Sequence, residues 1–153
     1  MTLLEIKSAL IQKLKSKYPP DQYHYYGLEV VEGYKKPSFF TQLKPVTLTF
    51  SNKNSTENVL TFYITYFQKE IDEVDMLRKV DEVRELFGMF LKVGERAIDI
   101  SDFSFEYAGN DKNILEISFD LEFFGKLEPD TDAELIASVQ SNIGLEEWNY
   151  GNA

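Results

Sequence analysis

The chain has 153 residues, of which 43% are apolar, 14% aromatic and 27% charged. This length and composition fit one globular domain and exclude a wholly disordered chain. The sequence contains no cysteine and a single histidine, His24. Disulfides, iron–sulfur clusters, thiolate zinc sites and a cysteine nucleophile are therefore excluded, and a histidine-rich metal site is excluded with them.

The net charge is −10, from 16 basic and 26 acidic residues, and it is unevenly distributed along the chain. Residues 1–53 contain eight lysines and four acidic residues (+4), whereas the remaining 100 residues contain 8 basic and 22 acidic ones (−14). A chain this acidic repels phosphate, which argues against sequence-specific nucleic-acid binding. The uneven distribution fits either a protein with one basic and one acidic face or an acidic, well-solvated surface.

The N-terminus mixes acidic and basic residues and has neither the basic start nor the apolar core of a signal peptide. No apolar stretch approaches the roughly 20 residues that span a bilayer. We therefore expect a soluble intracellular protein that has no membrane partner.

The first predicted element is a helix over 2–17. Thr2 and Glu5 form a capping box, in which the N-cap side chain and the residue three positions later satisfy each other's backbone donors. Apolar residues then recur at spacings of three and four, and two prolines end the helix.

Four strands are predicted next. Residues 23–26 form a short aromatic strand, Pro37 marks the start of a second, residues 46–51 alternate between apolar and polar, and residues 59–68 are β-branched and aromatic. The polar stretch 51–58 predicts that the last two strands form a hairpin with a long, mobile connection.

A second helix is predicted to begin after the N-cap Asp72 and to run to Gly94. Its apolar stripe contains Met76, Val80, Val83, Phe87 and Phe90, and its polar side contains Arg78, Lys79, Glu82 and Glu85.

The final strands follow this helix. Apolar positions in 97–100 and 103–107 differ in phase, which predicts a bulge at Ser101–Asp102. From Leu115 to Phe123 apolar residues alternate strictly with polar ones, so one face of this strand is buried and the other is acidic.

This order of elements predicts an α+β fold in which an antiparallel sheet carries two main helices on one face. We expect one domain over 1–127. Residues 128–153 form a C-terminal extension, for which the capping box Thr131–Glu134 predicts a short helix followed by a flexible end. Its apolar residues are Leu135, Ile136, Val139 and Ile143.

Motifs for catalysis or cofactor binding are absent: there is no glycine-rich phosphate loop, nucleophile elbow or zinc-binding pair. Acidic pairs such as Asp99 and Asp102 lack a calcium-binding frame, and His24 is interpreted as a strand histidine packed beside tyrosines. We predict no enzyme activity, no catalytic or metal-binding residue and no cofactor.

One stretch carries a resemblance to a known family. It is Gly33-Tyr34-Lys35-Lys36-Pro37-Ser38-Phe39-Phe40, which lies between a capped, lysine-rich first helix and a hairpin that ends Tyr63-Ile64-Thr65-Tyr66-Phe67. Together with the order of elements over 2–126, it resembles the phage tail terminator family of prophages and contractile phage-like particles.

The resemblance implies a structural virion protein that forms a ring, commonly a hexamer, which caps the tail tube, stops its polymerisation and makes the tail side of the head–tail joint. Implied partners are other copies of itself, the tube protein, the head–tail connector and, in contractile particles, the sheath. DNA would pass through the ring lumen. The implied location is the virion tail, after assembly in the bacterial host cytoplasm.

The residues themselves favour two kinds of contact surface for such a ring or tube. One is the acidic strand face with Glu116, Asp120 and Glu122, and the other is the hairpin tip near Lys53. An alternative function is a non-enzymatic acidic adaptor or assembly chaperone that binds a basic protein.

Overall fold

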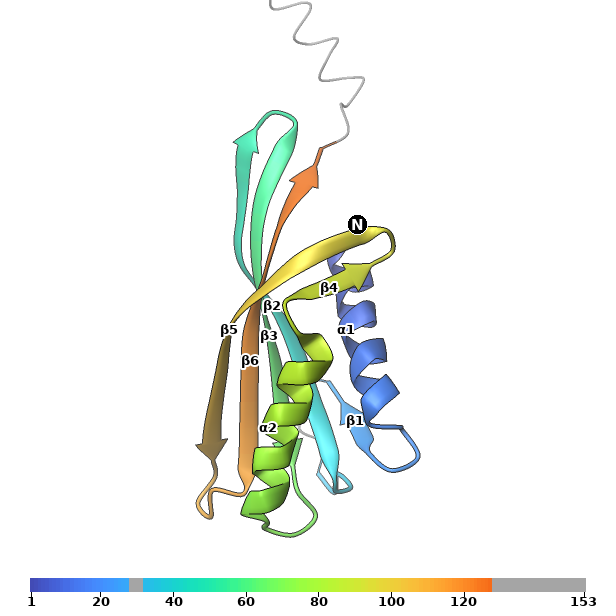
Figure 1. Ribbon diagram of the computed structural model, residues 1–153, viewed down its shortest axis with the longest axis vertical. Coiled ribbons are helices and arrows are strands. Elements are labelled where there is room, and N and C mark those ends of the chain that lie inside the picture. Colours follow the sequence, from blue (N-terminus) through green and yellow to red (C-terminus); the bar gives the residue numbers. More distant parts are fainter. Residues whose placement is uncertain (28–31, 128–153) are drawn as a thin grey trace, which may run out of the picture.

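The structure, a computed structural model, describes residues 1–27 and 32–127. Its elements in chain order are α1 (Leu3–Lys17), β1 (His24–Tyr26), β2 (Ser38–Asn52), β3 (Ser55–Phe67), α2 (Glu73–Phe87), β4 (Phe90–Val93), β5 (Arg96–Ala108) and β6 (Ile114–Lys126). The strands form one curled sheet in the order β1-β2-β3-β6-β5-β4, and both helices pack on the same face of it (Figure 1). Neither described helix combines the length and the apolar content that a membrane crossing requires.

The predicted α+β class is therefore confirmed, but the sheet is mixed and not wholly antiparallel. β1 runs parallel to β2, with His24 opposite Ser38 and Tyr26 opposite Phe40, whereas the other pairs are antiparallel. Parallel strands need a crossover of about a dozen residues, and the connection over 27–37 is long enough for one. Apolar alternation predicts which face of a strand is buried but not the direction in which the strand runs.

The first helix agrees with its prediction. The Glu5 amide donates to Thr2 Oγ1 (3.2 Å) and the Thr2 amide donates to Glu5 Oε2 (2.6 Å), which completes the capping box. Ile6, Leu10 and Leu14 are buried against the sheet. α1 thus begins where its sequence satisfies the first orphan donors, and its apolar stripe fixes the side that faces the core.

The second helix is shorter than predicted. Asp72 caps its start by accepting from the Val74 amide at 3.0 Å, but α2 ends at Phe87 because Gly88 adopts a φ of +62°. Gly88 reverses the chain, and the following residues form β4, an edge strand with Leu91 buried. The predicted end at Gly94 is wrong, because Phe90, which continues the helical spacing, is 57% exposed in β4, and its neighbour Leu91 is the residue that is buried.

The predicted long connection of the hairpin is also wrong. β2 continues to Asn52 and β3 begins at Ser55, so only Lys53 and Asn54 form the turn. The polar residues on both sides of the turn are paired strand residues. They can be polar because this end of the hairpin extends beyond both helices, which therefore do not cover it (Figure 1). Pro45 lies inside β2, on a stretch whose outer edge pairs with no other strand in residues 1–27 and 32–127.

The predictions for the last two strands are confirmed. The register between β5 and β6 shifts between Ser101 and Ser104, and Asp102 has a φ of +53°, which is the predicted bulge. In β6, Leu115, Ile117 and Phe119 are buried, as strict alternation requires. The predicted helix in residues 128–153 lies outside the described residues.

A charged residue lies within the core. Lys79, which the helical pattern places on the polar side of α2, is 4% exposed, and its Nζ donates to Asp75 Oδ1 at 3.0 Å. The ammonium group also lies 5.2–5.4 Å from the ring centres of Tyr18, Tyr23 and Tyr66. Aromatic faces attract cations, so the three rings replace part of the water that the ammonium group has lost.

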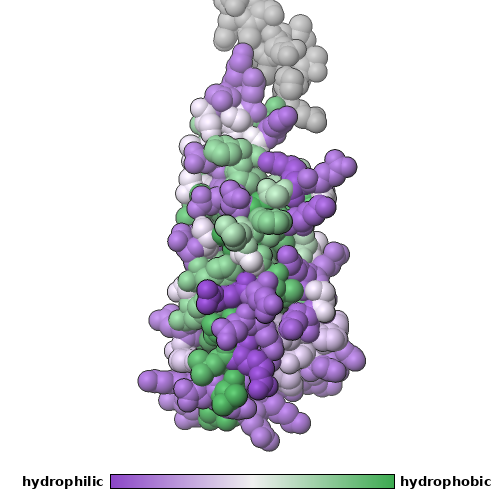
Figure 2. Space-filling model, in the orientation of Figure 1, coloured by the Kyte–Doolittle hydropathy of each residue, from purple (hydrophilic) through white to green (hydrophobic). Residues whose placement is uncertain are grey.

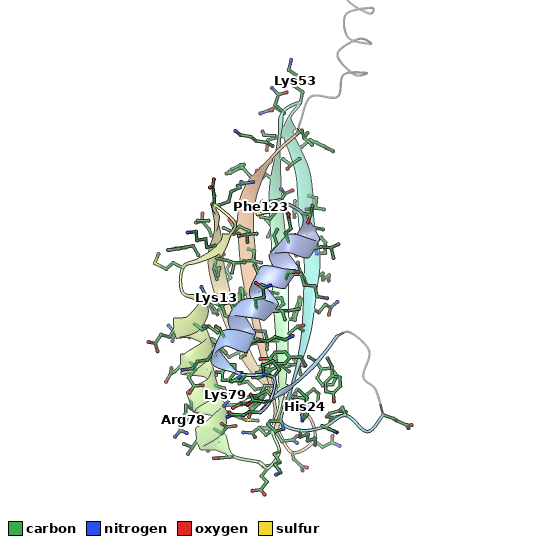
Figure 3. The ribbon with its side chains drawn as sticks, turned by 90° about the vertical axis from the view of Figure 1, so that its right-hand side faces the viewer. Lys13, His24, Lys53, Arg78, Lys79 and Phe123 are labelled. Carbon is green, nitrogen blue, oxygen red and sulfur yellow. The ribbon has the colours of Figure 1, made fainter. Side chains whose placement is uncertain are left out.

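The groups around this lysine connect the two helices to the sheet. Tyr66 Oη, from β3, donates to Asp75 Oδ2 at 2.8 Å, and Gln68 Nε2 donates to the same oxygen at 3.0 Å. Tyr18, at the end of α1, donates its hydroxyl to Glu82 Oε2 of α2 at 2.7 Å. We call this set of side chains around Lys79 the lysine cage; Figure 3 shows Lys79 between α1 and α2.

The ionisation of the pair follows from these contacts. Burial alone would lower the pKa of Lys79, but the hydrogen bond to Asp75 and the nearby Tyr23 outweigh burial and raise the pKa above its ordinary value. Burial alone would raise the pKa of Asp75, but hydrogen bonds from Gln68, Tyr66 and Lys79 outweigh it and lower the pKa. Both directions favour a charged pair at neutral pH.

We expect Lys79→Met to lower the free energy of unfolding by about 3 kcal/mol, because removing one partner of a buried pair leaves the other charge uncompensated. Urea unfolding monitored by circular dichroism measures this change. Arg78→Met is the matched control on the exposed side of the same helix turn, with an expected change within about 0.5 kcal/mol. Equal losses for the two variants would contradict a specific role of the lysine cage.

The pH dependence of this stabilisation has a predictable sign. A lowered Asp75 pKa contributes stability that is lost as pH falls through the folded-state pKa, below the ordinary value of 3.8. A raised Lys79 pKa contributes stability that is lost as pH rises above the ordinary value of 10.5. The difference in unfolding free energy between wild type and Lys79→Met should be constant from about pH 5 to about pH 9 and shrink on both sides. A difference in unfolding free energy that grows in acid would contradict a charged pair of Lys79 and Asp75.

Candidate assembly surfaces

One face of the sheet is covered by the helices, and the opposite, outer face of β5 and β6 carries acidic side chains. They are Asp99, Glu106, Glu116, Asp120 and Glu122, which we call the acidic ribbon. Three of the five, on β6, are predicted by the alternation of that strand. Asp99 and Glu106 join them because of the register of β5 against β6, which no pattern within either strand specifies.

Like charges face each other directly across these two strands. Asp99 is paired with Glu122, and Glu106 is paired with Glu116. Side chains at directly paired positions are close neighbours, and like charges there destabilise a sheet. Within the described residues the only ion pairs are Lys79 with Asp75 and the N-terminal amine with Glu5, so no cation of this part of the chain pairs with the ribbon.

Hydrogen bonds satisfy part of the acidic ribbon. Thr61 Oγ1, on the neighbouring strand β3, donates to Asp120 Oδ1 at 2.7 Å, and Ser101 Oγ donates to Glu122 Oε1 at 3.3 Å. These contacts orient two carboxylates but add no positive charge. The ribbon thus remains an ordered, negatively charged stripe on a sheet face that the described part of the chain leaves uncovered, suited to bind a basic surface or to repel phosphate.

The second predicted surface lies elsewhere. Lys53 is at the tip of the β2–β3 hairpin, at the far end of the elongated molecule from the lower end of α2 (Figure 3). Residues 44–52 of β2, the turn residues 53 and 54, residues 55–59 of β3 and 123–126 of β6 form a three-stranded projection that we call the arm. The structure therefore groups Glu116, Asp120 and Glu122 on one surface and places Lys53 on another.

The arm begins where two strands separate. The last pair between β5 and β6 is Asp99 with Glu122, and beyond it β5 turns toward β4 while β6 continues into the arm. The guanidinium group of Arg96 donates to the Phe124 carbonyl oxygen across this gap. One carbonyl on the open edge of β6 is thereby satisfied.

The hollows of the described surface differ in size. One, of about 160 Å³, lies on the outer face and is lined mainly by Phe40, Tyr63 and Phe67; it is smaller than the roughly 300 Å³ at which ligand pockets begin. A groove of about 590 Å³ lies between the first half of α1 and the β4–β5 turn. Its lining includes Met1, Leu4 and Arg96.

The single histidine and the acidic side chains form no metal-binding cluster within the described residues. His24 is half-buried in β1 (Figure 3). In residues 1–27 and 32–127, no three His, Asp or Glu side chains are placed to hold one metal ion.

Comparison with known proteins identifies the family. A sequence model described as phage tail terminator protein matches residues 5–134. The chain belongs to the phage tail terminator family. This confirms the family predicted from the Gly33–Phe40 stretch and the order of elements, and it makes the chain a structural protein of phage tails.

No curated protein matches the sequence. Eighteen chains of solved structures match the fold. One of them superposes over 85% of this chain and 99% of its own length, with a TM-score of 0.51 and 11% sequence identity. At that identity the likeness shows a shared fold alone.

Because like charges repel across β5 and β6, we expect Glu116→Gln to raise the free energy of unfolding by about 0.5 kcal/mol at low salt. The gain should shrink in 1 M salt, where the Debye length falls to about 3 Å. Glu57→Gln is the matched control, because Glu57 is exposed on the same face and is paired with Thr49 and Phe124, which carry no charge. Urea unfolding at two salt concentrations tests this, and a loss of stability in Glu116→Gln would contradict it.

Proposed function

We propose that this tail terminator protein forms a ring that caps the tail tube, stops its polymerisation and forms the tail side of the head–tail joint. The family membership carries this proposal. Its partners would be other copies of the chain, the tube protein, the head–tail connector and, in a contractile tail, the sheath. The ring would assemble in the bacterial cytoplasm and remain in the virion tail.

The distribution of charge supports such an assembly. A closed ring needs two different, complementary patches on each subunit. The acidic ribbon lies on the outer face of the sheet, whereas α1, on the opposite face, contains four lysines and one glutamate. Subunits that place the α1 side of one copy against the acidic ribbon of the next would pair opposite charges and bring cations to unpaired carboxylates.

The same ribbon would have a different role if it lined the lumen. A negative lumen repels phosphate and lets DNA pass without binding. The two placements predict different outcomes when the charge is reversed. At a subunit contact, reversal prevents ring formation; in the lumen, the ring still forms, and DNA binds to it.

The decisive experiment is the triple variant Glu116→Lys, Asp120→Lys and Glu122→Lys. We expect wild type to form a ring, alone or on contact with tube protein, and the variant to remain monomeric, because like charges then meet at the subunit contact. Light scattering at low and high salt, with and without tube protein, measures the mass.

The matched control reverses three exposed acidic residues outside the ribbon: Asp81→Lys, Glu85→Lys and Glu95→Lys. It changes the net charge equally and should assemble as wild type does. Wild type that stays monomeric and ignores tube protein would contradict the proposed function and favour an acidic adaptor or chaperone. A triple variant that assembles normally would remove only the ribbon from the subunit contact.

A further inference from the structure

The arm has an apolar side that the described residues leave uncovered. Leu48 and Phe50 of β2 are 53% and 73% exposed, and their paired residues on β3 are Asn58 and Thr56. Asn58 is flanked on its other side by Phe123 of β6. Asn58 is two residues from the buried Leu60, so these side chains lie on the same face of the sheet as the helices.

Figure 3 looks at this side of the arm, where Phe123 is labelled, and Figure 2, turned by 90°, shows the polar tip of the arm. The β2–β3 hairpin extends beyond both helices, as Figure 1 shows. From residue 41 to residue 52, β2 also pairs with no strand of the described residues on its outer side. An open edge next to exposed apolar side chains is a site of aggregation unless something covers it.

The rest of the chain starts at this surface. The Leu127 amide donates to the Asn54 carbonyl oxygen at 2.9 Å, so residues 128–153 continue from the tip of the arm. Pro129 and Asp130 favour a turn, and Thr131 with Glu134 forms a capping box. This sequence is suited to reverse the chain and start a helix directed back along the arm.

The apolar stripe of that segment fits the arm in length. Leu135, Ile136, Val139 and Ile143 recur at helical spacing. A helix over 131–143 is about 18 Å long at 1.5 Å per residue. The β2 stretch 46–50 is about 13 Å long at 3.3 Å per residue, so a single helix spans it.

The charges also match. Residues 128–153 contain six acidic residues and no lysine or arginine. The arm contains Lys44, Lys53 and Lys126 against one acidic residue, Glu57, and none of the three lysines forms an ion pair within the described residues. A negative segment is thus tethered to a positive projection, and the tether makes the local concentration of the segment high.

We propose that the C-terminal segment of each chain folds back on its own arm, with the apolar stripe of 135–143 packed on Leu48 and Phe50. The inference does not depend on ring formation, and most of the segment lies beyond the residues that the family model matches. An arm covered in this way presents its tip and its outer face to other proteins, and keeps its apolar side from contact with a second copy.

Because the sequence has no cysteine, a pair of introduced cysteines tests this contact in the full-length protein. The test pair is Leu48→Cys with Val139→Cys, and the matched control pair is Leu48→Cys with Ser138→Cys, one residue off the stripe. Under mild oxidation we expect the test pair to form a disulfide within one chain several-fold faster than the control pair. Non-reducing electrophoresis and peptide mass spectrometry measure the products.

Each other outcome overturns the proposal. Equal rates for the two pairs would mean that the segment moves freely past the arm. A disulfide-linked dimer would mean that a second copy occupies this face, and no cross-link at all would mean that the segment does not approach it. The test is repeated at concentrations where light scattering finds only monomer. A cross-link within one chain then reports on the folding back of the C-terminal segment, whether or not the proposed ring forms.

Discussion

The architecture depends on a buried ammonium group. Lys79 lies in the core with Asp75 as its counter-ion and three tyrosine rings around it, and these partners come from α1, α2, β3 and the segment before β1. An unpaired charge in such a place would be very costly, so each partner must be in position whenever the lysine is buried. The lysine cage therefore couples the packing of the two helices to the lower half of the sheet.

This packing has a consequence for the surface. Both helices pack on one face of the sheet. Within the described residues the outer face of β5 and β6 has no cover, so polar side chains are expected there. A mixture of positive and negative side chains, or Ser and Thr, would be enough to make this face polar. The acidic ribbon instead places like charges at paired positions, a choice that reduces stability. Features that cost stability without structural benefit are typical of functional surfaces, which agrees with a protein that acts through contacts in a phage tail.

The two ends of the molecule differ in the way they are stabilised. The lower half contains the aromatic core and the lysine cage, whereas the arm consists of three strands beyond the helices. Within the described residues, the arm is held by strand pairing, by the Thr56–Asn58 side-chain hydrogen bond (3.0 Å) and by the contact of Arg96 with the Phe124 carbonyl. A projection with so little core of its own gains most from a covering partner, which is the physical reason to look for one in the remaining chain.

Several features were determined by sequence alone, because neighbouring residues are sufficient to specify them. The capping box of Thr2 and Glu5 fixed the start of α1, the alternation from Leu115 to Phe123 fixed the buried face of β6, and the change of phase at Ser101 located the bulge. The stretch Gly33–Phe40 and the order of elements were sufficient to predict the family.

Other features were decided by the tertiary structure, because they depend on which distant segments meet. The direction of β1 depends on where the chain crosses over, and the burial of Lys79 depends on three tyrosines from other elements. Three of the five carboxylates of the acidic ribbon, those on β6, were predictable from the alternation of that strand. Only the register with β5 adds Asp99 and Glu106 and places like charges opposite each other. Local patterns carry the period of a strand or helix, whereas pairing and direction are set by packing between segments that are far apart in the chain.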